Sequence, residues 1–175
     1  MPRIAACWIG LLLSLVQWQA VAAPKVGEPA PDITLGVTQA GADAKVSDYA
    51  GKIVVVSFWA TWCAPCRKEL PILEGLQQQG KGNIQVIAVN IEKRDVFNKA
   101  AALLGAQLSL ILANDRSERA QRTYAVKSIP HLIIFGRDGH ILHIHDGYGD
   151  KELDVIVDEI NQALAAKLPA PGDKT

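Results

Sequence analysis

The chain has 175 residues, of which 49% are hydrophobic and 21% are charged, and its 18 basic residues balance its 18 acidic ones. This composition is typical of a globular domain with one core and excludes a disordered chain. Because there is no excess of positive charge to attract a polyanion, a nucleic-acid partner is not expected.

The first 22 residues have the pattern of a signal peptide. Arg3 supplies a positive charge, residues 4–16 are apolar, and Ala20–Ala22 is typical of a cleavage site. We expect cleavage after Ala22 and a periplasmic location. The alternative is an uncleaved membrane anchor, although the apolar run is short for a span of about 20 residues and is interrupted by Gln17 and Gln19.

The first half of the remaining chain predicts an arm and then alternating strands and helices. An arm rich in Gly, Pro and Ala holds two weak strands, at Asp32–Leu35 and Ala44–Val46. A continuous apolar run makes Lys52–Trp59 the first core strand. A helix is predicted over Pro65–Gln79, and Pro71 inside it should kink it. Ile84–Asn90 reads as a parallel strand covered on both faces.

The second half predicts a further strand–helix unit and a closing hairpin and helix. Apolar spacing gives a helix at Asp95–Leu104, a short strand at Leu108–Leu112 and a short helix at Ser117–Tyr124 with Ser117 as its N-cap. Asp138-Gly139 is a hairpin turn between a strand that ends at Phe135 and the strand His140–Asp146. Asp150–Lys167 is the closing helix. One domain is therefore expected over residues 23–167, with residues 168–175 as a disordered tail.

Two of the three cysteines, Cys63 and Cys66, belong to the mature chain, since Cys7 lies in the leader. Cys63 stands where a strand passes into a helix, where free amide groups and the helix dipole favour a thiolate. In such a place the pKa of the first cysteine falls from about 8.5 into roughly 3.5–7.5. A zinc site would need two further suitably spaced ligands, which the sequence lacks. The pair therefore predicts redox chemistry.

These residues carry a resemblance to a known family. Trp62-Cys63-Ala64-Pro65-Cys66 resembles the active site of the thioredoxin superfamily. The longer stretch over residues 58–71, with Glu69 three residues after Cys66, resembles the TlpA/ResA-type thiol–disulfide oxidoreductases, and the similarity extends over residues 26–164. It implies a thioredoxin-like α/β sandwich of three layers with a mixed sheet, an N-terminal β-hairpin extension and a central insertion between Asn90 and Ser117.

The resemblance also implies roles for single residues. Cys63 would be the exposed nucleophile and Cys66 the less exposed thiol that resolves the mixed disulfide. Pro130 would be a cis-proline, although an ordinary trans-proline at a strand start is the alternative. Glu69 would line the site and influence cysteine ionisation, against the alternative of a solvated charge. The residues expected to contact substrate are Trp62, Ala64, Pro65, Ile129 and His131.

The roles of Ser57 and of three histidines stay open. Thioredoxins have a buried aspartate where this chain has Ser57, so the proton path to Cys66 must use Glu69 or a water held by Ser57. His131 could tune a thiolate or bind copper with the cysteines, or be an ordinary strand side chain. His143 and His145 share a strand face, which is a weak metal signal.

The sequence thus predicts an exported thiol–disulfide oxidoreductase that reduces disulfides in partner proteins and needs no cofactor. By resemblance, its substrates would be oxidised apocytochrome c or the cysteines of a copper site, and its electron donor a membrane thiol transporter of the DsbD/CcdA kind. Pro65 and Ile129 resemble reducing thioredoxins. The alternatives are a disulfide-forming oxidase, a copper-binding chaperone and a peroxiredoxin-like peroxidase, the last disfavoured because no threonine precedes Cys63 by three residues.

Overall fold

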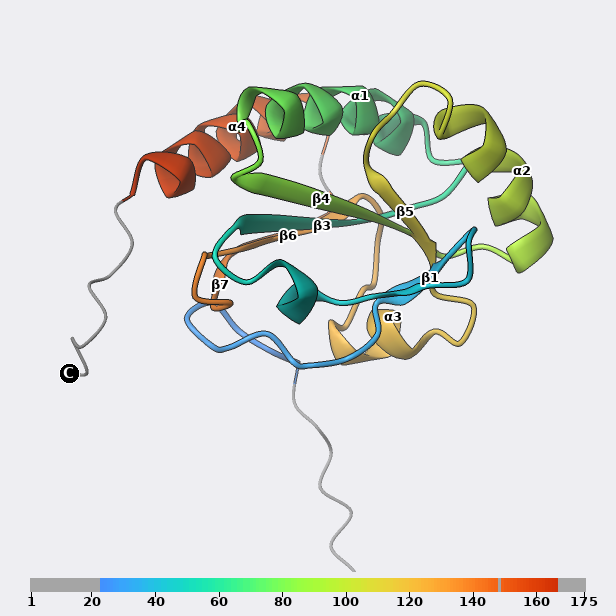
Figure 1. Ribbon diagram of the computed structural model, residues 1–175, viewed down its shortest axis with the longest axis horizontal. Coiled ribbons are helices and arrows are strands. Elements are labelled where there is room, and N and C mark those ends of the chain that lie inside the picture. The colour runs from blue at the N-terminus through green and yellow to red at the C-terminus, as the bar shows by residue number, and fades with distance from the viewer. Residues whose placement is uncertain (1–22, 148, 167–175) are drawn as a thin grey trace, which may run out of the picture.

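The computed structural model describes residues 23–147 and 149–166. The predicted signal peptide and cleavage site, Cys7 and the predicted C-terminal tail lie outside these residues. Within them, the chain forms a seven-stranded mixed sheet with helices on both faces (Figure 1). The predicted thioredoxin-like three-layer sandwich is confirmed. No helix among the described residues is long and apolar enough to span a bilayer.

The sheet is built around three parallel strands, and every other neighbouring pair in it is antiparallel. Its order is β2-β1-β5-β4-β3-β6-β7. The bounds are β1 Gly36–Thr38, β2 Asp43–Ala44, β3 Ile53–Trp59, β4 Ile84–Asn90, β5 Ile111–Asn114, β6 His131–Phe135 and β7 Ile141–Asp146. Strands β3, β4 and β5 run parallel, while β6 lies antiparallel to β3 on its other side. Their carboxyl ends therefore meet at one edge, beside the start of β6.

Two layers of helix cover the sheet. The helices are α1 Ala64–Gln79, α2 Arg94–Leu104, α3 Arg119–Thr123 and α4 Asp150–Ala165, with a 3-10 turn η1 at Val46–Tyr49. Buried residues of α1, α2 and α4 pack on one face with Val55 and Trp59 of β3. Val54, Val56 and Phe58 of the same strand face α3 and η1. All seven residues of β3 are buried, which explains its continuous apolar sequence.

Several short elements differ from the sequence predictions because side chains compete for the backbone. The strand predicted at Leu108–Leu112 forms at Ile111–Asn114, because Ser109 donates its N–H to the Glu74 carboxylate at 2.8 Å instead of to a strand. Ser117 is not the cap of α3. The Asp115 carboxylate accepts the N–H groups of Arg119 and Gln121, at 3.0 and 2.9 Å, and α3 is correspondingly short.

The N-terminal hairpin is present but shifted. Its first strand is Gly36–Thr38 and not Asp32–Leu35, because β1 pairs closely with β5 and a Cβ at Gly36 would lie 2.9 Å from the backbone of Asn114. Its second strand, Asp43–Ala44, ends earlier than predicted, since the chain turns into η1. Helix α1 continues through Pro71 to Gln79.

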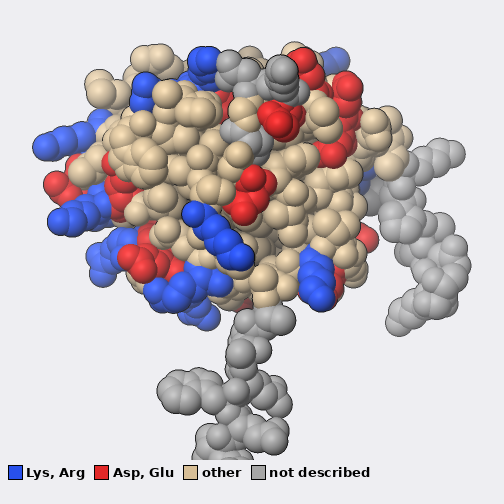
Figure 2. All heavy atoms as spheres, turned by 180° about the vertical axis from the view of Figure 1, so that it is seen from behind, with Lys and Arg blue, Asp and Glu red and all other residues tan. Residues whose placement is uncertain are grey.

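Charged side chains are mixed over the surface. On the face shown in Figure 2, basic residues gather toward the α2 side with some acidic residues among them, and further acidic residues lie toward the α4 side. This distribution agrees with the zero formal net charge.

Candidate active site

Cys63 and Cys66 lie at the junction of β3 and α1 and form a disulfide, with their Cα atoms 5.3 Å apart. Cys63 is the N-cap of α1, and its Sγ accepts the N–H of Cys66 at 3.2 Å. Pro65 occupies the first helical turn, where its missing N–H leaves no intrahelical bond unmade. One amide group of the helix start, that of Cys66, thus donates to the sulfur, in the place where the sequence predicts such a contact.

The two cysteines are less accessible than expected. Cys63 is 4% exposed and Cys66 is 0% exposed, so the order of exposure is as predicted but Cys63 is not an exposed side chain. The reason is that both belong to the apolar cluster that contains Trp59 and Leu70. Trp62, in contrast, is 67% exposed. In this oxidised form, Trp62, Ala64 and Pro65 provide the accessible surface around the disulfide.

The Ile129–Pro130 peptide bond is cis, as the resemblance implied. Pro130 is buried directly before β6, which pairs with β3 in a register that sets His131 opposite Phe58. The prolyl bond therefore lies near the end of β3, from which the cysteine loop departs. A surface hollow of about 180 Å³ is lined by both Trp62 and Ile129. It joins the cysteine loop to the cis-proline loop.

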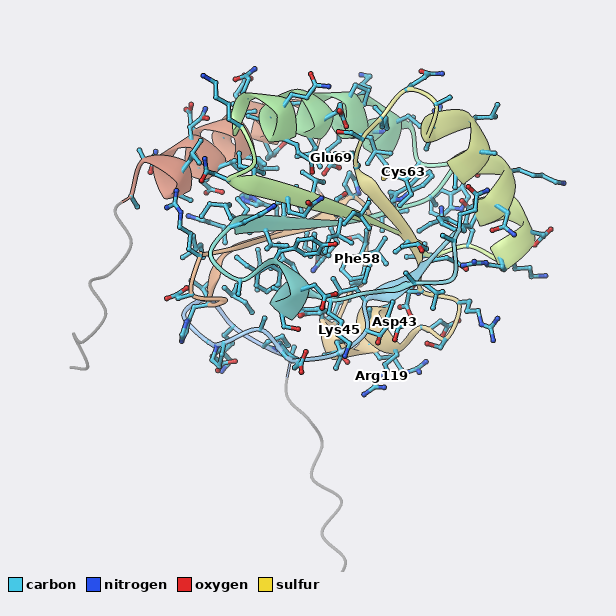
Figure 3. The ribbon with its side chains drawn as sticks, in the orientation of Figure 1. Asp43, Lys45, Phe58, Cys63, Glu69 and Arg119 are labelled. Atoms are coloured by element: carbon cyan, nitrogen blue, oxygen red, sulfur yellow. A yellow bond between two sulfur atoms is a disulfide. The ribbon has the colours of Figure 1, made fainter. Side chains whose placement is uncertain are left out.

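Glu69 is completely buried, which excludes the alternative of a solvated charge on α1. It lies three residues after Cys66, on the helix face that also buries Leu70 and Leu73. Figure 3 shows Glu69 and Cys63 on one side of the sheet and Phe58 on the other. Glu69 is therefore placed in the same layer as the cysteines.

Ser57 replaces the expected aspartate and is also completely buried. It alternates with Val56 and Phe58 along β3, so it shares the face of Val55 and Trp59, the side covered by α1. Its Oγ has no hydrogen-bond partner among the described residues. A hydroxyl is thus available in the layer that contains Cys66.

His131 does not face the cysteines, so of its two interpretations the tuning of a thiolate is not supported. Its ring packs edge-on against Phe58, with 5.7 Å between centroids, on the opposite face of the sheet. It is 3% exposed, and its Nδ1 lies 3.1 Å from Oδ1 of Asp146. Burial lowers the pKa of His131, and the hydrogen bond and charge of Asp146 oppose this only in part. The alternative of a strand side chain is the observed one.

His143 and His145 do share a face of β7, and both contact Glu159 of α4, at 3.1 and 2.6 Å. Within the described residues, no group of three His, Cys, Asp or Glu side chains is arranged to hold a metal ion. The histidine pair connects a strand to a helix.

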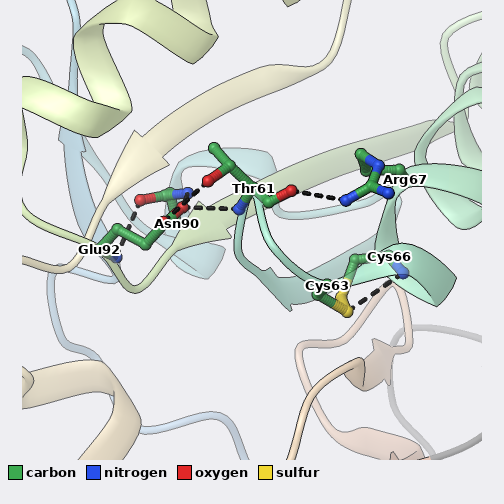
Figure 4. The surroundings of a disulfide bond; sticks show 6 residues. All are labelled: Thr61, Cys63, Cys66, Arg67, Asn90 and Glu92. Atoms are coloured by element: carbon green, nitrogen blue, oxygen red, sulfur yellow. Dashed lines mark hydrogen bonds between the residues drawn. A yellow bond between two sulfur atoms is a disulfide. The ribbon is translucent and has the colours of Figure 1, made fainter.

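A polar network beside the disulfide was missed by the sequence reasoning (Figure 4). Glu92, two residues after β4, accepts both the N–H and the hydroxyl of Thr61 in the cysteine loop. Asn90, the last residue of β4, donates to Glu92. Polar residues at the ends of parallel strands were the signal for it, because these ends meet at one edge of the sheet.

A disulfide at the start of the first core helix, opposite a cis-proline in a mixed sheet of this order, defines a thioredoxin-like redox protein. The Redoxin family pattern matches residues 25–164. The chain belongs to this family and is a TlpA/ResA-like member of the thioredoxin superfamily.

Named relatives agree with this assignment. The thioredoxin-like protein YneN of Bacillus subtilis is 36% identical over 124 residues, which are 69% of this chain and 71% of YneN. The thiol–disulfide oxidoreductase ResA of Geobacillus thermodenitrificans is 32% identical, over 73% of this chain and 72% of ResA. A crystal structure of a DsbE-type thiol:disulfide interchange protein from Chlorobium tepidum superposes with a TM-score of 0.72 at 30% identity, over 81% of this chain and 99% of that one. The protein is a thiol–disulfide oxidoreductase.

Proposed function

We propose that the protein works outside the cytoplasm as a reductant of disulfides in partner proteins. The observation that supports this most is the position of Cys63 at the start of α1, next to a hollow that reaches the cis-proline loop. The Cys63 thiolate attacks one sulfur of the partner disulfide and forms a mixed disulfide. The Cys66 thiolate then attacks Cys63, which releases the reduced partner and leaves the Cys63–Cys66 disulfide, with two electrons transferred.

The surroundings of the cysteines favour reduction over oxidation. A strong oxidant of this fold needs a stabilised thiolate, because that stabilises its reduced form. Here Ala64 and Pro65 between the cysteines carry no charge, and the carboxyl group of Glu69 is buried on the Cys66 side of α1. A nearby carboxylate disfavours a thiolate. The disulfide form is therefore favoured, which is the property of a reductant.

The hollow between Trp62 and Ile129 suits an extended segment of a partner protein. Its lining is part apolar and part polar, and the chain enters β6 directly after it. A substrate segment lying there would place its disulfide over Cys63 and could form strand-like backbone hydrogen bonds with Ile129. Trp62 would cover one side of the segment and Ile129 the other.

Export and the electron supply follow from the N-terminal segment and the resemblance. Residues 1–22 have the pattern of a signal peptide, and an exported reductant needs electrons from across the membrane. A thiol transporter of the DsbD/CcdA kind would supply them. Apocytochrome c or a copper-site protein would be the substrate. We do not propose the copper-chaperone alternative, because His131 lies on the opposite face from the cysteines.

The reduction potential of the Cys63–Cys66 pair tests this proposal. The full-length chain is expressed in a Gram-negative host, the periplasmic protein is purified, and its mass should correspond to cleavage after Ala22. Equilibration with thiol buffers should then give a potential near that of thioredoxin, about −270 mV. A value near about −120 mV would instead identify an oxidase. A Cys66→Ser variant cannot release the partner, so it should accumulate the mixed disulfide between Cys63 and the partner protein, which can then be identified.

A further inference from the structure

The loop that carries Thr61 into the redox site is held by a carboxylate from the segment just after β4. Oε2 of Glu92 accepts the backbone N–H of Thr61 at 2.6 Å, and Oε1 accepts its hydroxyl at 2.8 Å (Figure 4). Two charge-assisted hydrogen bonds to one residue fix both its position and its orientation. Thr61 stands two residues before Cys63, so the contact acts directly upstream of the nucleophile.

Glu92 is itself fixed by the ends of two strands. The Asn90 amide donates to Oε2 of Glu92 at 3.1 Å, and its oxygen accepts the Glu92 N–H at 2.9 Å. From β5, the Asn114 amide donates to the Glu92 carbonyl at 2.8 Å. Both asparagines are almost fully buried. The carboxylate is therefore attached to the rigid centre of the sheet.

The helix side of the loop is held as well. The Arg67 guanidinium donates to the carbonyl of Thr61 at 2.7 Å, and Arg67 directly follows Cys66. The N–H of Cys63 donates to the carbonyl of Ala60 at 3.1 Å. The hydroxyl and both backbone polar groups of Thr61 thus have partners, and these partners stand on both sides of the disulfide.

We propose that Glu92 is a positioning residue that holds Cys63 at bridging distance from Cys66 by fixing Thr61. Closing a disulfide within one chain depends on the effective concentration of one thiol at the other. A loop released from Glu92 lets Cys63 explore more positions, so the disulfide forms less readily and is reduced more easily. The proposal rests on the thiol–disulfide exchange of this pair and not on its direction.

Three substitutions separate positioning from charge. Glu92→Gln keeps the shape: its amide oxygen can accept the Thr61 N–H, and its amide group can donate to the Thr61 hydroxyl, which also accepts. Glu92→Ala removes both bonds. Thr61→Val removes only the bond of the hydroxyl and preserves the backbone one.

The chain also offers a matched control. The carboxylate of Glu74 accepts the N–H and the hydroxyl of Ser109 at 2.8 and 2.7 Å, which is the same arrangement away from the cysteine loop. Glu74→Ala should therefore lower stability as Glu92→Ala does, without affecting the disulfide. Urea unfolding of each variant measures this shared cost.

The experiment measures the equilibrium constant for forming the Cys63–Cys66 disulfide from the two thiols in defined glutathione buffers. Hydrogen bonds to a charged group are strong enough that Glu92→Ala should lower this constant roughly tenfold, which corresponds to about 30 mV for two electrons. Thr61→Val should lower it roughly threefold. Glu92→Gln and Glu74→Ala should stay within about twofold of the parent.

Other results would overturn the proposal. An equal shift in Glu92→Gln and Glu92→Ala would show an effect of charge, and an equal shift in Glu74→Ala would show a general loss of stability. If Glu92→Ala does not fold, Thr61→Val decides, since an unchanged constant there contradicts positioning. The parent potential tests the direction of the reaction separately, because only differences between variants bear on Glu92.

Discussion

Glu69 belongs to a charged stretch, Arg67-Lys68-Glu69, and yet only its first two side chains are exposed. The helix period explains the difference, because Glu69 lies one turn after Cys66 on the inward face of α1. A carboxyl group there stands on the side of the thiol that must lose its proton in the second step of exchange. The residue type alone does not reveal this, but its place on the helix does.

Substitution of Glu69 by Gln should slow that second step by roughly 10²-fold, since proton transfer by a positioned side chain contributes about 10²–10⁴. Rapid-mixing fluorescence with a disulfide peptide, followed from pH 5 to 9, measures the rate of partner release. The pH profile of this rate should change as well. Glu74→Gln, on the same helix and also buried, is the control. An unchanged rate and profile in Glu69→Gln would leave Glu69 a packing role only.

At the scale of elements, the long helices and the central strands were predictable, and the short elements were not. β3, β4, α1 and α4 bury enough apolar residues for periodicity to define them. β5 and α3 are displaced because Glu74 and Asp115 take backbone donors that the apolar pattern does not show. The first of these contacts joins residues that are distant in sequence, and the second depends on which side chain caps the start of α3.

The site divides in the same way. Cys63 and Cys66 are adjacent in a motif and were found directly. Pro130 was found through the resemblance alone, because only about 5–6% of X–Pro bonds are cis in folded proteins. Glu92 was missed because its contact with Thr61 spans 31 residues. The side of the sheet on which His131 lies was left open, since the strand register that turns it away from the cysteines is a tertiary property.

The turn after β7 supports the cis-proline loop and provides a test at this scale. Gly147 has φ +65, donates its N–H to the Pro130 carbonyl at 2.9 Å, and has no room for a Cβ, which would lie 2.5 Å from Oγ of Ser128. Gly147→Ala should displace Ser128 from Asp146, destabilise the fold by about 1–3 kcal/mol and raise KM for a disulfide peptide.

Gly139→Ala at the other end of the hairpin is the matched control. Its φ is +80, but a Cβ there would meet nothing within 4 Å. It should cost stability through backbone conformation, by about 1 kcal/mol, and leave KM unchanged. Calorimetry and steady-state kinetics on both variants separate the two effects. Equal KM values in the two variants would show that Gly147 does not support the substrate loop.

For the whole molecule, the redox site combines two halves that meet at one end of the sheet. The cysteine loop follows β3 and is fixed by Glu92, just beyond β4. The cis-proline loop precedes β6 and is fixed by Asp146, the last residue of β7, which accepts the Ser128 hydroxyl at 2.7 Å and contacts His131. The second half depends on a titratable pair, so acid should weaken it and the fold together.

The pH dependence of folding stability follows from the direction in which each pKa is shifted. Burial lowers the pKa of His131. The hydrogen bond and charge of Asp146 act in the opposite direction, and the nearby charge of His145 lowers this pKa further. The unfolded chain therefore binds more protons at this residue. The contribution of His131 to stability decreases as the pH falls below about 6.5 toward the pKa of His131 in the folded protein. Burial also acts on Asp146, but hydrogen bonds from Ser128 and His131 outweigh it and lower its pKa. That contribution persists above the unfolded carboxyl value and is lost in stronger acid.

His131→Asn tests the first of these windows, because an amide can still donate to Asp146 but does not titrate. Tyr124 also packs on Phe58, but its pKa is raised by burial, so it stays neutral in this pH range and does not contribute to the pH dependence. The other three histidines are present in both proteins, so the difference isolates His131. Urea unfolding between pH 5 and 7.5 should show a shallower pH dependence in the variant, by at most about 1.4 kcal/mol per pH unit. Parallel curves would mean that His131 is protonated equally in the folded and unfolded chains, and that the cis-proline loop is not the acid-sensitive half of the site.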